Sequence, residues 1–281
     1  MVARIRKDII YGWTPLTDGE LSQLDVGMIR LKPGQTFDIK TRAREFAFVL
    51  IHGECDISLA SGLEGSMGPR GNPFEDPPFG LFVTRDEQVT FIARAETLIG
   101  AGSAPAAGKM TNRLVHPEDT GGGRRGADNW ERLVRFVCWN DNTEGNMLMA
   151  GETCTPSGNW SSVPPHRHQI DTPGEEVPYE EAYFFQFSRP EGFGLLRDFD
   201  AGFDHDEAHV IRHNDLFCIP GNYHPLVCGP GATLYHLTFM AGPRRMSQSS
   251  VHPAYMSILE DRDMPNPFRN QSVKAGSEAA K

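Results

Sequence analysis

Short apolar runs separated by glycine and proline are the feature of this sequence that most restricts its fold. The 281 residues include 29 Gly and 21 Pro. The runs between them are rich in Val, Ile, Phe and Thr, which is typical of antiparallel strands joined by tight turns. Helical periodicity is nearly absent. The sequence therefore predicts an all-β protein, a sandwich or barrel of the jelly-roll type.

The candidate strands fall into two similar sets, separated by a glycine-rich segment between Glu118 and Asn129. The first set covers residues 25–31, 45–51, 55–60, 79–84, 88–94 and 96–100, and the second covers 132–139, 146–154, 181–187, 193–199, 208–212, 215–219 and 233–241. Because the separating segment has the most flexible composition in the chain, we place a domain boundary there. We expect one domain over residues 1–120, another over 128–263, and a disordered tail over 264–281, where residues are small and polar.

Charge and cysteine content restrict the partners and the compartment. A net charge of -10 argues against nucleic acid and anionic membranes as partners, because like charges repel. No apolar run reaches the roughly 20 residues of a membrane span, and the N-terminus lacks the apolar core of a signal peptide. The five cysteines are scattered, which argues against a disulfide framework. A reducing cytoplasm fits this composition best.

Histidines concentrate in the second half, where eight of the ten follow residue 129. His166 and His168 are two residues apart on a stretch that reads as extended, so their side chains should face the same side. Glu181 opens a strand-like segment whose alternation puts Glu181 and Tyr183 on one face. His224 follows a Pro-Gly turn.

Three imidazoles and one carboxylate form a ligand set that suits a divalent metal ion. Such a set leaves coordination positions open to water or substrate, which is typical of a catalytic site rather than a closed structural one. The alternative is that each histidine is a surface residue or a hydrogen-bonded core residue. Four groups in one pattern favour the metal site.

Longer segments of the second half resemble a known family. The pattern of two histidines, a glutamate and a third histidine after a Pro-Gly turn is similar to the motifs of the cupin superfamily. The segments SGNWSSVPPHRH, EEAYFF, GFGLLR, IPGNYHP and LYHLTFMAGPRR resemble the 5-deoxy-glucuronate isomerase family of the IolB/KduI type. The first half resembles that family only in its strand layout.

The resemblance implies a chain of two cupin domains, which are jelly-roll β-barrels, with metal ligands in the second domain only. It implies one divalent ion per chain, Zn, Mn or Fe, held by His166, His168, Glu181 and His224. The ligands leave the metal's identity open. Cupins also pair sheet edges across subunits, so we expect a homo-oligomer of unspecified size.

The reaction that the resemblance implies is an aldose-ketose isomerisation, an intramolecular oxidoreduction of a small sugar acid. It would convert 5-deoxy-D-glucuronate to 5-dehydro-2-deoxy-D-gluconate in myo-inositol catabolism, through an enediolate whose charge a metal stabilises. A general base must reach the C2 proton. Glu176, Glu180 and Tyr235 are unranked candidates, although a regular strand would turn Glu180 away from Glu181.

Arg197, Arg244 and Tyr183 match family positions expected near the substrate, where arginine suits a carboxylate through paired donors. Their alternatives are a solvated surface charge for each arginine and core packing for the tyrosine. His236 stands where the family resemblance leads us to expect an aromatic residue. The rival functions are a related hexuronate ketol-isomerase of pectin breakdown, a metal-dependent cupin dioxygenase and a sugar-binding cupin without enzyme activity.

Overall fold

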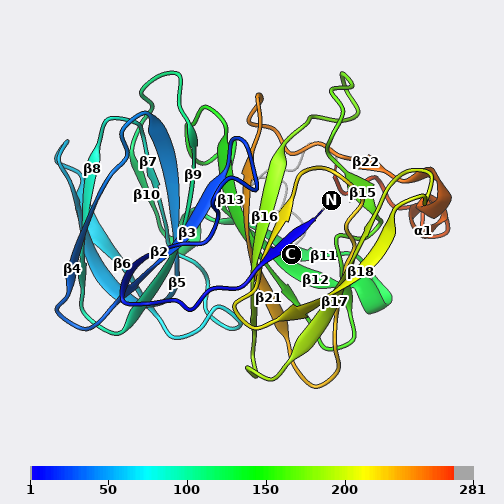
Figure 1. Cartoon of the computed structure of the whole chain (residues 1–281), viewed down its shortest axis with the longest axis horizontal. Helices are drawn as coiled ribbons and strands as arrows, with labels where there is room; N and C mark the ends of the chain where they lie inside the picture. The colour runs from blue at the N-terminus through cyan, green and yellow to red at the C-terminus, as the bar shows by residue number, and fades with distance from the viewer. Residues whose placement is uncertain (1, 269–281) are drawn as a thin grey trace.

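The computed structural model describes residues 2–268, which form two β-barrels side by side (Figure 1). The first ten strands are β1 (Ala3–Ile5), β2 (Gly12–Pro15), β3 (Asp25–Leu31), β4 (Thr36–Lys40), β5 (Arg44–Leu59), β6 (Glu64–Arg70), β7 (Gly80–Val83), β8 (Gln88–Ala93), β9 (Thr97–Pro105) and β10 (Arg113–Val115). The later strands are β11 (Gly121–Arg125), β12 (Arg132–Cys138), β13 (Leu148–Thr155), β14 (Trp160–Ser161), β15 (His166–Arg167), β16 (Glu180–Phe187), β17 (Phe193–Phe199), β18 (Asp206–Arg212), β19 (Leu216–Ile219), β20 (Leu226–Cys228), β21 (Leu234–Ala241) and β22 (Ser250–Val251). The helical turns are η1 (Pro117–Asp119), η2 (Asp128–Trp130), η3 (Pro253–Tyr255) and α1 (Ser257–Glu260).

The all-β prediction is confirmed, and every predicted strand overlaps an observed one. Two predicted strands, 45–51 and 55–60, are parts of the single strand β5. Residues 44–52 of β5 pair with β9, whereas residues 53–59 pair with β6 and β8. The change of partners falls at Gly53, where φ is +103° and a Cβ would lie 2.4 Å from the Glu96 carbonyl oxygen. Glycine is therefore required where β5 passes between the two layers of the first barrel.

The second barrel combines a seven-stranded sheet, in the order β1-β19-β16-β21-β13-β12-β11, with a four-stranded sheet, in the order β14-β20-β17-β18. All pairings in these two sheets are antiparallel. The inner face of this barrel holds the histidine-rich region.

An apolar layer joins the two barrels. Its buried residues come from both halves and include Met28, Ala47, Val49, Ala182, Phe184, Leu237 and Phe239. On β9, a Cβ at Gly100 or Gly102 would lie 2.3 Å from Leu237 or Phe239 respectively. The two glycines thus let the facing sheets approach closely enough for the large side chains of β21 to pack on β9.

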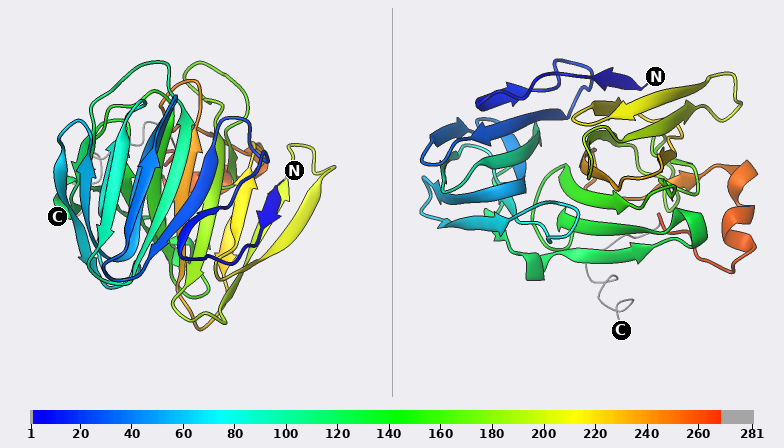
Figure 2. Two further views of the ribbon diagram at one scale, coloured as in Figure 1. Left: turned by 60° about the vertical axis from the view of Figure 1, so that its left-hand side comes forward. Right: turned by 90° about the horizontal axis from the view of Figure 1, so that it is seen from below.

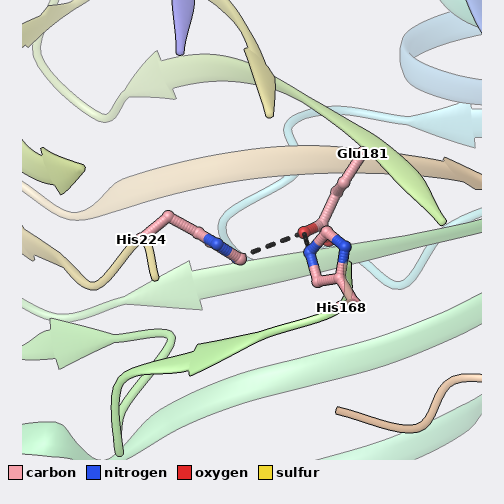
Figure 3. Close-up of side chains that lie close together, drawn as sticks. All are labelled: His168, Glu181 and His224. Atoms are coloured by element: carbon pink, nitrogen blue, oxygen red, sulfur yellow. Dashed lines mark hydrogen bonds and ion pairs between the residues drawn. The ribbon is translucent and has the colours of Figure 1, made fainter. Parts of the chain in front are cut away.

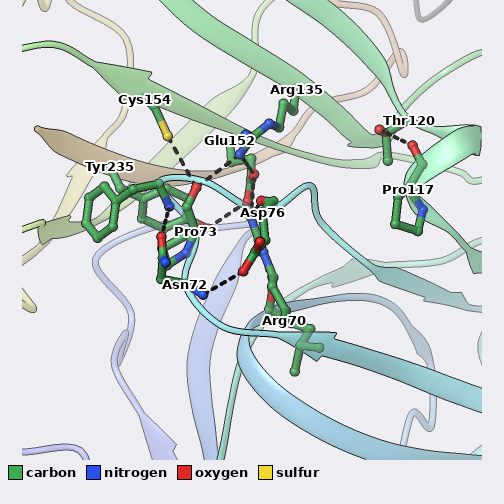
Figure 4. A network of polar contacts seen from close by, with 12 residues as sticks. Arg70, Asn72, Pro73, Asp76, Pro117, Thr120, Arg135, Glu152, Cys154 and Tyr235 are labelled. Carbon is green, nitrogen blue, oxygen red and sulfur yellow. Dashed lines mark hydrogen bonds and ion pairs between the residues drawn. The ribbon is translucent and has the colours of Figure 1, made fainter.

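A buried polar network also crosses between the halves (Figure 4). The carboxylate of Glu152 on β13 accepts hydrogen bonds from Arg70 (2.7 Å), Arg135 (2.8 Å) and the Tyr235 hydroxyl (3.0 Å). The side chains of Arg70 and Glu152 have no exposed surface. Since Arg70 belongs to the first barrel, this ion pair fixes one barrel relative to the other.

Three segments depart from the layout that the sequence suggests. Within the segment of flexible composition between residues 118 and 129, Gly121–Arg125 form β11 and pair with β12. Gly122 lies so close to β12 that a Cβ would be 2.1 Å from the Val134 carbonyl oxygen. Glycine here serves close packing rather than freedom.

The start of the chain also leaves the first barrel: β1 pairs with β19, and the blue segment in Figure 2 runs across to the yellow strands of the second barrel. At the other end, Phe268 is buried against His166, although the sequence assigns it to the expected disordered tail; residues 269–281 lie outside the described residues. Among residues 2–268, no helix has the length and apolarity needed to cross a membrane.

Candidate metal centre

Strand β16 positions the centre by its simple alternation. Ala182 and Phe184 point into the apolar layer between the barrels, whereas Glu181 and Tyr183 point into the second barrel. The predicted alternation is therefore confirmed. Glu181 and Tyr183 line a cavity together with residues of β12, β13 and β21.

Inside the barrel, the Glu181 carboxylate lies between two histidines (Figure 3). Its Oε2 is 3.0 Å from Nε2 of His168 and 3.3 Å from Nε2 of His224. The ligand atoms of these three buried residues all lie within 4.8 Å of one another. Among residues 2–268, these three form the one group of His, Cys, Asp or Glu side chains whose ligand atoms lie close enough to share a metal ion.

The hydrogen bonds of the imidazoles define which ring nitrogen is protonated and which one presents a lone pair to the Glu181 carboxylate. Nδ1 of His168 donates to the Tyr179 carbonyl at 2.7 Å, and Nδ1 of His224 donates to the Asn222 carbonyl at 2.7 Å. In the neutral tautomer, each Nε2 then carries a lone pair directed toward Glu181. Two lone pairs facing a carboxylate need a cation between them, and backbone bonds of this kind are those that orient metal-binding histidines. The donor set therefore fits a divalent ion.

His166, the fourth predicted ligand, lies beside this cluster. Its ring centroid is 5.0 Å from that of His224, and its Nδ1 is 3.2 Å from the Pro164 carbonyl. One face of the ring stacks on Phe268 at 3.6 Å between centroids. The structure therefore brings three of the four predicted ligands together and places the fourth next to them, with the same Nδ1 arrangement.

Burial and the local charges set the protonation of the centre. Although burial favours the neutral form of Glu181, its close contacts with His168 and His224 hold its pKa well below the usual range. Burial lowers the pKa of His166 well below its ordinary value, and the neighbouring imidazoles add to the effect. A carboxylate beside a neutral imidazole is the protonation state that metal binding requires.

Other inward side chains complete the cavity. The Tyr183 hydroxyl is 3.4 Å from the Ser162 hydroxyl, and the Tyr183 ring lies 4.6 Å from that of His236. Nδ1 of His236 is buried and has no hydrogen-bond partner among the described residues. Burial lowers the pKa of His236 to about 3. His236 therefore lies in the cavity as a neutral imidazole.

The structure places the three candidate bases away from the cavity. The Glu180 carboxylate accepts hydrogen bonds from the backbone of residues 22–24. The Glu176 carboxylate accepts bonds from the backbone N–H groups of Gln169 and Ile170 and from Arg167. Tyr235 points into the interbarrel layer and donates to Glu152. Glu180 and Glu176 therefore stabilise loop backbone, and Tyr235 is part of the buried network around Glu152.

The two candidate arginines are likewise engaged elsewhere. Arg197 forms a two-pronged ion pair with Asp206, at 2.7 and 2.6 Å, and donates to the Tyr255 hydroxyl. Arg244 is exposed and paired with Asp171. Of the three substrate-binding candidates, Tyr183 alone is a cavity residue.

Sequence reasoning missed two arginines that line the cavity, Arg125 and Arg132. Arg132 begins β12 and lies on the same face as the inward residues Val134 and Phe136. A strand was predicted over 132–139, and its alternation puts Arg132 on one face with Val134 and Phe136. Because Leu133 and Val137 make the opposite face apolar as well, alternation alone did not show which face borders the cavity.

The two barrels and the single candidate centre among the described residues define a two-cupin protein. The chain belongs to the KduI/IolB family, which its residues 4–258 match. It is 31% identical to the 5-deoxy-glucuronate isomerase of Geobacillus kaustophilus over 83% of this chain and 84% of that protein. It is 28% identical to the 5-deoxy-glucuronate isomerase of Bacillus licheniformis over 87% of this chain and 90% of that protein.

Solved structures give the same architecture. An IolB-like protein from Salmonella typhimurium superposes with a TM-score of 0.85 and 26% identity, covering 92% of this chain and 98% of that one. The oxalate decarboxylase of Lactobacillus farciminis has a TM-score of 0.64 at 11% identity, covering 98% of this chain and 94% of that one. The second likeness concerns the fold alone. The predicted two-cupin fold and the family resemblance are confirmed.

Proposed function

We propose that this chain is a 5-deoxy-glucuronate isomerase, converting 5-deoxy-D-glucuronate to 5-dehydro-2-deoxy-D-gluconate in inositol catabolism. The observation that carries the proposal is the buried Glu181 carboxylate faced by the Nε2 lone pairs of His168 and His224. Membership of the KduI/IolB family and relatives named for this activity support the choice of substrate.

His168, Glu181 and His224 would hold one divalent ion, and His166 would join them as a fourth ligand. When bound, such an ion supplies Lewis-acid stabilisation of the negative charge that develops on the substrate oxygens during proton transfer. The Nδ1 hydrogen bonds of the three histidines to carbonyls keep their rings oriented toward that position.

The isomerisation moves a proton between neighbouring carbons, and two cavity groups can hold or move it. The Tyr183 hydroxyl can donate a proton, and the free Nδ1 of His236 can accept one. Both residues are buried, so the reaction would proceed away from bulk water. We propose these two in place of Glu176, Glu180 and Tyr235, whose polar groups are used outside the cavity.

The test combines metal analysis of the purified protein with an isomerase assay on 5-deoxy-D-glucuronate. We expect near-stoichiometric metal and turnover in the wild type, and loss of both in His168→Ala and Glu181→Gln. His116→Gln in the first barrel is the matched control and should keep both.

Bound metal without turnover would indicate that the substrate is another hexuronate or that the protein is a dioxygenase. An oxygen electrode would detect the oxygen consumption of a dioxygenase. No metal in protein expressed with Zn, Mn and Fe supplied would overturn the proposal.

A further inference from the structure

Among residues 2–268, the cavity beside the candidate centre includes a buried arginine that forms no ion pair. Arg132 is 5% exposed, and residues 2–268 place no carboxylate in an ion pair with it. Its Nη1 donates to the Trp130 carbonyl at 3.3 Å, while its buried Nε has no hydrogen-bond partner among the described residues. Burying a cation without a partner costs free energy, so such a group calls for a ligand.

A second arginine lies beside it. Arg125 on β11 is directly opposite Arg132 on β12, and both line the cavity. Like charges facing each other across two strands are destabilising. Burial lowers the pKa of Arg132 to about 10, and the Arg125 cation adds to the effect. The two guanidinium groups thus concentrate positive charge where β11 and β12 border the cavity.

The turn between β11 and β12 is built closely around Arg132. Gly126 has φ +91°, and a Cβ there would lie 2.2 Å from the Trp130 carbonyl oxygen and 2.9 Å from Nη1 of Arg132. The guanidinium also lies 5.7 Å from the centroid of the Trp130 ring. These contacts restrict the direction of the side chain, as expected of a preorganised binding group.

The same cavity reaches the candidate centre at Glu181. Glu181, His166, Tyr183 and His236 line it together with the two arginines, and the Arg132 charge acts on His236 strongly enough to contribute to its lowered pKa, after burial. A ligand in this cavity therefore meets the two guanidinium groups together with Glu181, His166 and His236.

We propose that Arg132, assisted by Arg125, binds the carboxylate of the sugar-acid substrate and so fixes which end of the sugar faces the centre. This inference rests on the proposed function and names the group that recognises its substrate class. A guanidinium offers paired donors that match a carboxylate, and Nε is one of the donors still free. Arg197 and Arg244, the expected candidates, already bind Asp206 and Asp171.

The experiment compares two substrates, 5-deoxy-D-glucuronate and its C6 carboxamide, which has the same shape without the charge. Arg132→Met should lower kcat/KM for the acid by about 10- to 150-fold, the range of a lost charge-assisted hydrogen bond. It should change kcat/KM for the carboxamide by less than about threefold. Arg132→Lys should restore part of the activity on the acid.

Arg124→Met is the matched control, because Arg124 is the neighbour of Arg125 on β11 but is exposed and paired with Glu131. This control should retain the wild-type preference for the acid. Without ligand, Arg132→Met should unfold at a temperature no lower than the wild type, since it removes an unpaired buried charge. If it fails to fold, Arg132→Lys and Arg125→Met are compared on the same two substrates.

Calorimetric titration of the acid into wild type and Arg132→Met separates this inference from the proposed function. If the wild type turns over the acid and Arg132→Met loses kcat/KM equally on both substrates, the inference is overturned and the isomerase assignment stands. If the wild type binds the acid tightly without converting it and Arg132→Met does not bind it, the role of the arginine is supported and the isomerase assignment is overturned. A wild type that neither binds nor converts the acid would overturn both.

Discussion

Glu180 and Glu181 are consecutive residues of β16 whose carboxylates serve opposite sides of the sheet. Glu181 meets His168 and His224 inside the second barrel. Glu180 accepts hydrogen bonds from the backbone N–H groups of Ser22, Gln23 and Leu24 in the segment between β2 and β3. One strand therefore supports the candidate centre with one residue and anchors the first half of the chain with the next.

Substituting Glu180 tests this division of roles. Glu180→Gln should lower the free energy of unfolding by about 1–3 kcal/mol, because an amide accepts the three backbone bonds less well than a carboxylate. We expect kcat/KM and metal content within about twofold of the wild type. Urea unfolding and steady-state kinetics check both. Loss of turnover in a protein with normal metal and stability would return Glu180 to the role of general base.

Removing the metal should destabilise the protein, because the ion would bind the folded chain and not the unfolded one. At free metal about 100-fold above Kd, binding adds about 2.7 kcal/mol, so a strong chelator should lower Tm by several degrees. Scanning calorimetry with and without chelator measures the shift. Glu181→Gln is the control and should respond little to the chelator. An identical shift in that variant would place the metal elsewhere.

Tyr183→Phe probes the cavity hydroxyl with the ring retained. We expect kcat to fall by about 10²-fold or more if the hydroxyl carries the proton, with bound metal unchanged because Tyr183 is not among the three clustered ligand residues. Tyr255→Phe, which removes a hydroxyl outside the cavity that binds Arg197, serves as the control. A Tyr183 variant with full kcat would leave proton transfer to His236.

The interbarrel network predicts a large effect on stability. Glu152→Gln leaves the cations of Arg70 and Arg135 without their buried carboxylate, which should cost about 3–5 kcal/mol. Glu54→Gln, in an exposed ion pair with Arg94, should cost less than about 1 kcal/mol. Denaturant unfolding of the two variants gives the comparison. Equal, small effects would mean that the buried pair does not hold the barrels together.

The sequence predicted the parts of the molecule that local pattern controls. Alternation along β16 was enough to put Glu181 and Tyr183 on the inner face. That alternation depends on neighbours in the sequence, so a period of two residues was a sufficient guide. The place of His224 beside Glu181 was expected from the pattern of ligand residues and the family resemblance.

What could not be predicted depends on partners far along the chain. Gly121–Arg125 has the composition of a linker, yet it pairs with β12 because Gly122 permits a close approach. Arg197 and Arg244 resembled carboxylate binders, but Asp206 and Asp171 lie next to them in space. Arg132 begins a predicted strand, but it lines the cavity only because the strands close into a barrel. Composition carries no information about such neighbours.

The pairing of β1 with β19 has a consequence for how the chain is synthesised. Arg6, just after β1, binds the buried Asp215, just before β19, and the two residues are 209 positions apart. At about 5–20 residues per second, a ribosome needs on the order of ten seconds or more between them. During that interval β1 has no β19 edge to join, so this pairing can form only after residues 216–219 have been made.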